Sequence, residues 1–147
     1  MKQLFYTLLT ITVFASCGSS KKDFLSRSDD DKTLYDAVKT LSKHPDDTNA
    51  LKALPILYSL AQERHLAKIT KYTNENSLSG KDKVIDEYAI LQKMYDAING
   101  DATSSRLVAP VNYQVNLDNS KQQAAEAYYL EATTAMDAPG RENSKKA

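Results

Sequence analysis

The sequence predicts an all-α fold, because apolar residues recur at helical spacing in four long stretches. These stretches cover residues 29–44, 46–72, 81–99 and 121–137. Glycine and proline, four of each in 147 residues, interrupt the pattern at few positions. Strand-like alternation occurs only near residues 107–118. We therefore expect antiparallel helix pairs or a helical bundle, with one extended segment.

The first predicted helix covers residues 29–44. The aspartates at 29–31 can cap free N–H groups at its start and suit the helix dipole there. Pro45 should end it, because proline disfavours helical geometry in the residue before it. Its buried face, with the spacing i, i+3, i+4 and i+7, should consist of Leu34, Ala37, Val38 and Leu41.

The second predicted helix begins at residues 46–48, and its apolar face should hold Leu51, Leu54, Leu57, Tyr58 and Ala61. Pro55 lies inside it, where proline removes a hydrogen bond and costs about 3 kcal/mol, so we expect a kink or a helix start there. The pattern resumes at Leu66, Ala67, Ile69 and Tyr72. Because no glycine or proline marks a turn, this part is either a continuation or a separate helix.

A loop is expected at residues 74–81, where Asn, Ser and Gly80 gather. The helix after it should end at Asn99 and Gly100, which tolerate the left-handed conformation. Its apolar side should carry Val84, Ile85, Tyr88, Leu91, Tyr95 and Ile98. The last long helix should be capped by Asn119 and Ser120, and a turn at 138–140 should lead into the start of another helix at 141–147.

Between these helices, polar residues alternate with Val111, Tyr113, Val115 and Leu117. The backbone groups of a strand need a partner, and no second stretch alternates in this way. Two interpretations stay open. The segment is extended and packs across helices, or it is a strand that pairs with another chain or with a part of the protein beyond this sequence.

The spacing of large and small residues resembles that of tetratricopeptide repeats. The run Ala125-Glu126-Ala127-Tyr128-Tyr129 looks like the first helix of such a repeat. Ala132 follows it at the position where a small residue allows two helices to approach closely. Similar offsets occur at Pro45, Leu51, Leu54, Tyr58 and Ala67, and a thinner match at Tyr88, Leu91 and Tyr95. The resemblance implies stacked helix pairs with a concave side that binds proteins. It also implies a domain over 29–147, which would be truncated if helices continue past Ala147. A generic bundle or a solvated C-terminal tail would fit the same residues.

The N-terminus has the features of a secretory signal peptide, with Lys2 before a short apolar run at residues 4–14. This run is shorter than the roughly 20 apolar residues of a spanning helix. Phe14-Ala15-Ser16-Cys17 resembles the lipobox of bacterial lipoproteins. The resemblance implies removal of residues 1–16, acylation (palmitate) of Cys17 and a flexible tether over 17–28. An ordinary secretory signal with Cys17 near the cut is the alternative.

Lipidation would account for the single cysteine, which cannot form an internal disulfide, and its acyl chains would hold the protein to a membrane. The aspartate that marks inner-membrane retention in some lipoproteins is absent, because Gly18 and Ser19 follow Cys17. We therefore expect a lipid-anchored protein of the cell envelope, at the outer membrane rather than the inner one. Nineteen basic and nineteen acidic residues give no net charge, so we expect no nucleic-acid partner.

Catalytic and metal-binding motifs are missing from the sequence. His44 and His65, the only histidines, lie 21 residues apart without a His-Glu-x-x-His motif or a cysteine pair. The four glycines form no phosphate loop. Solvated carboxylates are the default for Glu63, Glu87 and Glu131. We expect no enzymatic activity, no cofactor and no metal site.

The nine tyrosines fall into two groups. Core spacing applies to Tyr58, Tyr88, Tyr95 and Tyr128, whereas the candidates for a partner-binding surface are Tyr35, Tyr72, Tyr113 and Tyr129. We expect a membrane-anchored lipoprotein that binds or scaffolds other proteins. One alternative is a nutrient (glycan) uptake lipoprotein, although the chain has no tryptophan. Another is the N-terminal part of a longer protein whose activity lies downstream.

Overall fold

The structure is a computed structural model, and it describes residues 23–137. In this part of the chain all regular secondary structure is helical and no strand occurs. The elements are η1 (Leu25–Arg27), α1 (Asp31–Lys43), α2 (Thr48–Glu75), α3 (Leu78–Asn99), α4 (Ser104–Leu107) and α5 (Gln114–Asp137). The predicted all-α fold is confirmed. The signal peptide, Cys17 and the elements expected at 138–147 lie outside the described residues.

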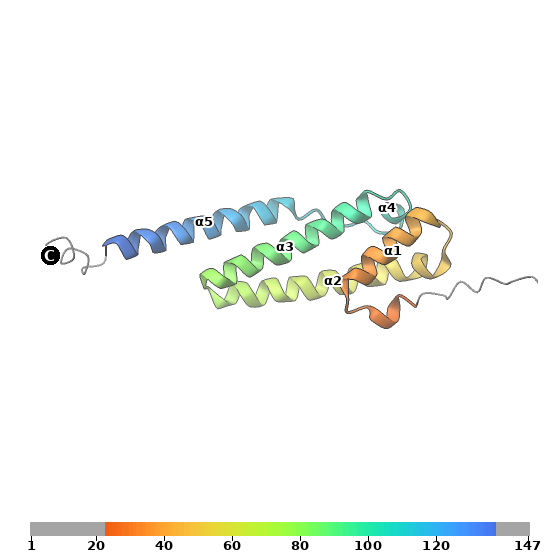
Figure 1. Cartoon of the computed structure of the whole chain (residues 1–147), viewed down its shortest axis with the longest axis horizontal. Coiled ribbons are helices and arrows are strands. Elements are labelled where there is room, and N and C mark those ends of the chain that lie inside the picture. Colours follow the sequence, from red (N-terminus) through yellow and green to blue (C-terminus); the bar gives the residue numbers. More distant parts are fainter. Residues whose placement is uncertain (1–22, 138–147) are drawn as a thin grey trace, which may run out of the picture.

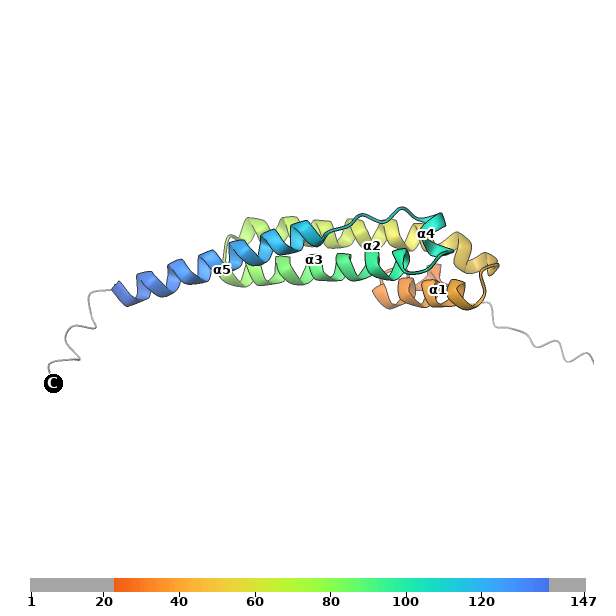
Figure 2. The same ribbon diagram turned by 90° about the horizontal axis from the view of Figure 1, so that it is seen from above.

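An antiparallel hairpin of α2 and α3 forms the spine of the molecule (Figure 1). Helix α1 packs on one half of this hairpin, and α5 packs on the other half, antiparallel to α3 (Figure 2). Helix α5 then runs past the corner at which α2 turns into α3, so its C-terminal end projects from the bundle (Figures 1 and 2). No helix in residues 23–137 has the length and apolar character that a membrane crossing requires.

Two apolar clusters fill the two halves of the hairpin. The larger one joins α1, the first half of α2 and the end of α3, and its most deeply buried side chains include Leu34, Leu41, Leu54, Leu57, Met94 and Ile98. The smaller one lies under α5 and contains Ile69, Leu91 and Tyr113. The apolar face predicted for the first helix from its 3.6-residue period is buried, as expected.

The flexible tether predicted for 17–28 does not extend to residue 28. Phe24 is only 4% exposed and belongs to the larger core, and η1 follows it directly. Burial of an aromatic side chain ties this segment to the bundle. The side chain of Asp30 then caps α1 by accepting a hydrogen bond from the Lys32 amide at 2.9 Å. The folded part of the chain therefore already includes Phe24.

Helix α2 is continuous to Glu75, so residues 66–72 continue the second helix rather than form a separate one. Its start is capped by Asp47, whose carboxylate accepts hydrogen bonds from the amides of Asn49 (3.1 Å) and Ala50 (2.8 Å). Pro55 lies inside the helix and neither starts nor ends it. The Pro55 side chain is exposed, and its missing N–H leaves the carbonyl of Leu51 without its usual helical partner.

The connection between α2 and α3 consists of Asn76 and Ser77 alone, instead of the loop predicted for 74–81. Asn76 ends α2 in the left-handed conformation, with φ of 44°. The Ser77 hydroxyl accepts a hydrogen bond from the Gly80 amide at 2.9 Å and so caps α3. A Cβ atom on Gly80 would lie 2.7 Å from the Tyr72 carbonyl oxygen, so this glycine permits the tight corner.

The predicted end of α3 at Asn99 is confirmed, but Gly100 has φ of −75° and is not left-handed. The segment predicted to be extended over 107–118 is shorter, because Leu107 still belongs to α4 and α5 already begins at Gln114. Only residues 108–113 lie outside regular structure. The cap predicted at Asn119 and Ser120 is therefore wrong, since both residues lie within α5.

Candidate functional site

Three side chains hold the segment before α5 in place. The Tyr58 hydroxyl accepts a hydrogen bond from the Val111 amide at 2.9 Å, and Gln92 Oε1 accepts one from the Tyr113 amide at 2.8 Å. Gln62 Nε2 donates to the Tyr113 hydroxyl at 2.8 Å. Side chains of α2 and α3 thus accept hydrogen bonds from backbone amides of this segment. In a strand, these amides would instead bond to a neighbouring strand. This anchoring fixes where α5 starts on the hairpin.

The four tyrosines predicted for a partner-binding surface do not come together. Tyr113 is a core residue, 7% exposed, with its ring centroid 6.0 Å from that of Tyr88, so this prediction is wrong. Tyr35 is half-buried against the larger core, and burial, followed by the carboxylates of Asp31 and Asp96, raises its pKa. Tyr72, near the α2–α3 corner, is also half-buried, whereas Tyr129 is exposed on the projecting end of α5.

Of the tyrosines predicted at core spacing, Tyr58 is buried but Tyr128 is not. The Tyr128 side chain is 44% exposed, and its hydroxyl donates to Asp82 Oδ2 of α3 at 2.5 Å. This hydrogen bond raises the pKa of Tyr128. The core position predicted for Tyr128 is therefore wrong, although its hydroxyl reaches α3.

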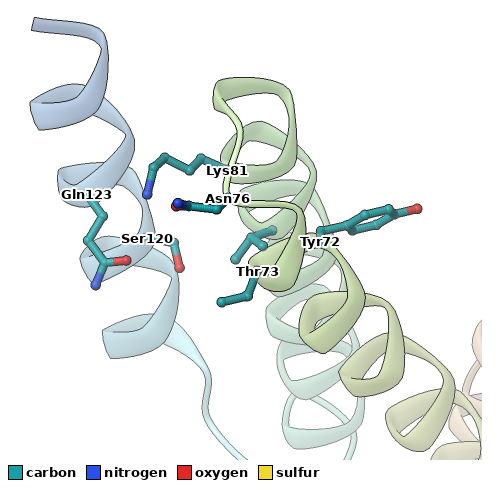
Figure 3. Close-up of a pocket in the computed structure, with 7 residues that line it drawn as sticks. Tyr72, Thr73, Asn76, Lys81, Ser120 and Gln123 are labelled. Carbon is teal, nitrogen blue, oxygen red and sulfur yellow. The ribbon is translucent and has the colours of Figure 1, made fainter. Parts of the chain in front are cut away.

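A pocket of about 100 Å³ lies between α5 and the α2–α3 corner (Figure 3). Its lining combines amide, hydroxyl and ammonium groups with one apolar side chain: Tyr72, Thr73, Asn76, Lys81, Val84, Ser120 and Gln123. The ends of Lys81 and Asn76 lie near each other and face α5, whereas the Tyr72 ring points away (Figure 3). The pocket therefore presents one ammonium group, together with amide and hydroxyl groups that can donate or accept hydrogen bonds, to a small polar group.

Beyond this pocket, α5 exposes large apolar side chains. Tyr129 is 73% exposed, Leu130 67% and Met136 57%, and all three lie in the last nine residues of α5. Val115, near the start of α5, is also exposed. Gathered apolar side chains on a small protein mark interaction surfaces. The projecting end of α5, defined here as residues 129–137, is the most exposed apolar part of the described chain.

A charged cluster inside the bundle joins three helices. His65 of α2 is 1% exposed, and its Nε2 lies 3.0 Å from Asp31 Oδ2 of α1, while its Nδ1 forms a hydrogen bond with Glu87 Oε2 of α3. Arg64 pairs with Asp31, and Lys68 Nζ lies 3.2 Å from Glu87 Oε1. The cluster ties the helices in one register, which suits a structural role.

Sequence reasoning missed this cluster, and the solvated state predicted for Glu87 is wrong because Glu87 is buried. A signal was present, since Glu87, Leu91, Met94 and Ile98 follow the spacing i, i+4, i+7 and i+11 on one face of α3. A carboxylate on a core face needs a cationic partner. Within residues 23–137 no group of three or more histidine, cysteine, aspartate or glutamate side chains is arranged to hold a metal ion.

Comparisons of the chain with protein-family models, curated proteins and solved structures find no match. Its function must therefore be inferred from its own residues. The candidate binding site has two adjoining parts. One is the pocket between α5 and the α2–α3 corner, and the other is the projecting end of α5 with its exposed apolar side chains.

Proposed function

We propose that this protein is a lipid-anchored lipoprotein of the cell envelope that binds or scaffolds other proteins through the projecting end of α5. The observation that carries the proposal is the exposure of Tyr129, Leu130 and Met136 on one free helix end. At about 25 cal/mol per Å² of apolar surface, covering such side chains is a favourable source of binding energy. The role is passive, and no chemical step is involved.

The anchor in this proposal is an acylated Cys17 at the outer membrane. Six residues separate Cys17 from Phe24, so even a fully extended connection spans at most about 25 Å. Phe24 is fixed in the core beside α1, whereas α5 projects from the other half of the hairpin (Figure 1). The short connection would hold the half of the hairpin that carries α1 close to the bilayer. The projecting end of α5 lies at the other half and would remain free for a partner.

Site-specific photo-cross-linking in intact cells tests this proposal. A photoreactive amino acid at Leu130 should give a discrete adduct of higher mass, because this side chain lies in the proposed contact. The same group at Ser59, an exposed position on α2, is the matched control and should give none. Equal labelling from the two positions, or no adduct from Leu130 or its neighbour Tyr129, would refute a binding role for this end of α5.

The pocket favours a second candidate function, uptake of a glycan. Amide and hydroxyl groups such as those of Asn76, Ser120 and Gln123 are suitable partners for sugar hydroxyls. Calorimetric titration of the full chain in detergent micelles with neutral oligosaccharides tests this. Saturable binding that is lost in Gln123→Ala would support uptake, and absence of heat would leave the protein-binding role.

A further inference from the structure

The pocket between α5 and the α2–α3 corner contains a cation without a counter-ion. Lys81, on the first turn of α3, is half-buried, and its ammonium group makes no ion pair with any described residue. No acidic side chain lines the pocket. An ammonium group that is partly removed from water is stabilised by a nearby negative charge. The pocket is therefore electrostatically suited to an anionic group.

Two acidic residues that lie near Lys81 in the sequence already have partners. Glu75 lies 3.7 Å from Lys83 Nζ, and Asp82 accepts the hydrogen bond from the Tyr128 hydroxyl. The charge of Lys81 thus remains available to a group that enters from outside.

The other lining groups fit a carboxylate. The side-chain amides of Asn76 and Gln123 can each donate hydrogen bonds to it, whereas the Ser120 hydroxyl already donates its proton to the Asn116 carbonyl at 2.8 Å. Val84 supplies an apolar contact for a methylene group. A volume of about 100 Å³ accommodates a carboxylate with a few carbon atoms, which is the size of an acidic side chain.

Helix α5 connects this pocket to its projecting end. Gln123, Ala127 and Leu130 follow the spacing i, i+4 and i+7 and so share one face of α5. Leu130 therefore lies about 10 Å further along the same face than Gln123. Three residues of an extended peptide cover about 10 Å. A segment along this face can place a carboxylate in the pocket and an apolar side chain against Leu130.

We propose that the pocket binds an acidic side chain of the protein partner, in an extended segment that carries an apolar residue three positions away. The Lys81 ammonium pairs with the carboxylate, the amides of Asn76 and Gln123 orient it, and Leu130 covers the apolar residue. This inference rests on the proposed function, because it names what the partner of α5 presents to the surface.

Fluorescence anisotropy with a labelled peptide tests the inference on the full chain in detergent micelles. The probe is a capped glycine-rich peptide with glutamate and leucine three positions apart, in either order, and its control carries glutamine in place of glutamate. We expect the glutamate peptide to bind at least about tenfold more tightly, as is typical when a charge-assisted hydrogen bond is lost. Lys81→Met should remove this preference.

Lys52→Met is the matched control, because Lys52 is an exposed lysine of α2 and its replacement should change neither affinity. Circular dichroism of both variants establishes that the fold is kept. Equal binding of the two peptides, an unchanged preference in Lys81→Met, or no binding at about 1 mM peptide would overturn the inference. Photo-cross-linking from Leu130 would still report a partner in those cases, so failure of this inference is distinguishable from failure of the proposed function.

Discussion

Replacing Glu87 by alanine should lower the free energy of unfolding by about 3–5 kcal/mol, as is typical when one partner of a buried ion pair is removed. The Glu87 side chain is 10% exposed and faces both His65 Nδ1 and Lys68 Nζ. Its loss leaves the His65 ring, 1% exposed, without one of its two hydrogen-bond partners. Lys68 is 42% exposed and can turn to water, so most of the cost comes from His65 and from the cavity.

Urea unfolding followed by far-UV circular dichroism measures this effect. With an m-value of about 1.5 kcal/mol per M, the transition midpoint should fall by about 2 M or more. Glu63→Ala, at an exposed glutamate of α2, is the matched control and should change the stability by less than about 0.5 kcal/mol. The double replacement His65→Leu and Glu87→Leu should recover most of the loss, because apolar side chains can substitute for a buried pair. If Glu87→Ala were no more destabilising than Glu63→Ala, the cluster would not hold the helices together.

The remaining predictions concern the anchored segment and the core. Tyr58→Phe should cost about 1–3 kcal/mol and speed hydrogen exchange of the Val111 amide, which loses its acceptor. Leu54→Ala should cost about 2–5 kcal/mol in thermal unfolding, whereas Leu130→Ala should be nearly neutral, and the reverse order would refute the assigned core. Burial holds the pKa of Tyr58 above 10.0, so the unfolded chain loses this proton first. Stability should therefore be retained below pH 10 and fall as the pH rises further, and a urea midpoint that is constant across this range would contradict the assignment.

The helices and most of the core were predictable from the sequence because burial imposes a 3.6-residue period. Leu34, Leu41 and Leu54 show this period and are fully buried. The alternation at residues 111–117 was misleading, because only Tyr113 and Leu117 are buried there. They are four residues apart, and this spacing also fits the start of α5. The hydrogen bonds from Tyr58 and Gln92 that replace a strand partner come from distant helices, and local patterns do not contain them.

The binding surface was only partly predictable. Tyr129 is exposed and Tyr72 is half-buried, but Tyr113 is buried because the chain turns back over α3 just before α5. The pocket around Lys81 depends on how α5 lies across the α2–α3 corner, which no sequence period determines. The tetratricopeptide-like stacking stays a prediction, as does lipidation.

The central proposal is that a lipid on Cys17 holds this helical bundle to a membrane. Metabolic labelling with a palmitate analogue, followed by separation of membrane and soluble fractions, tests this directly. We expect the wild-type chain to carry the label and remain with the membrane, and Cys17→Ser to lose both properties. A label that persists in Cys17→Ser, or a wild-type chain that is freely soluble, would contradict the proposed anchor.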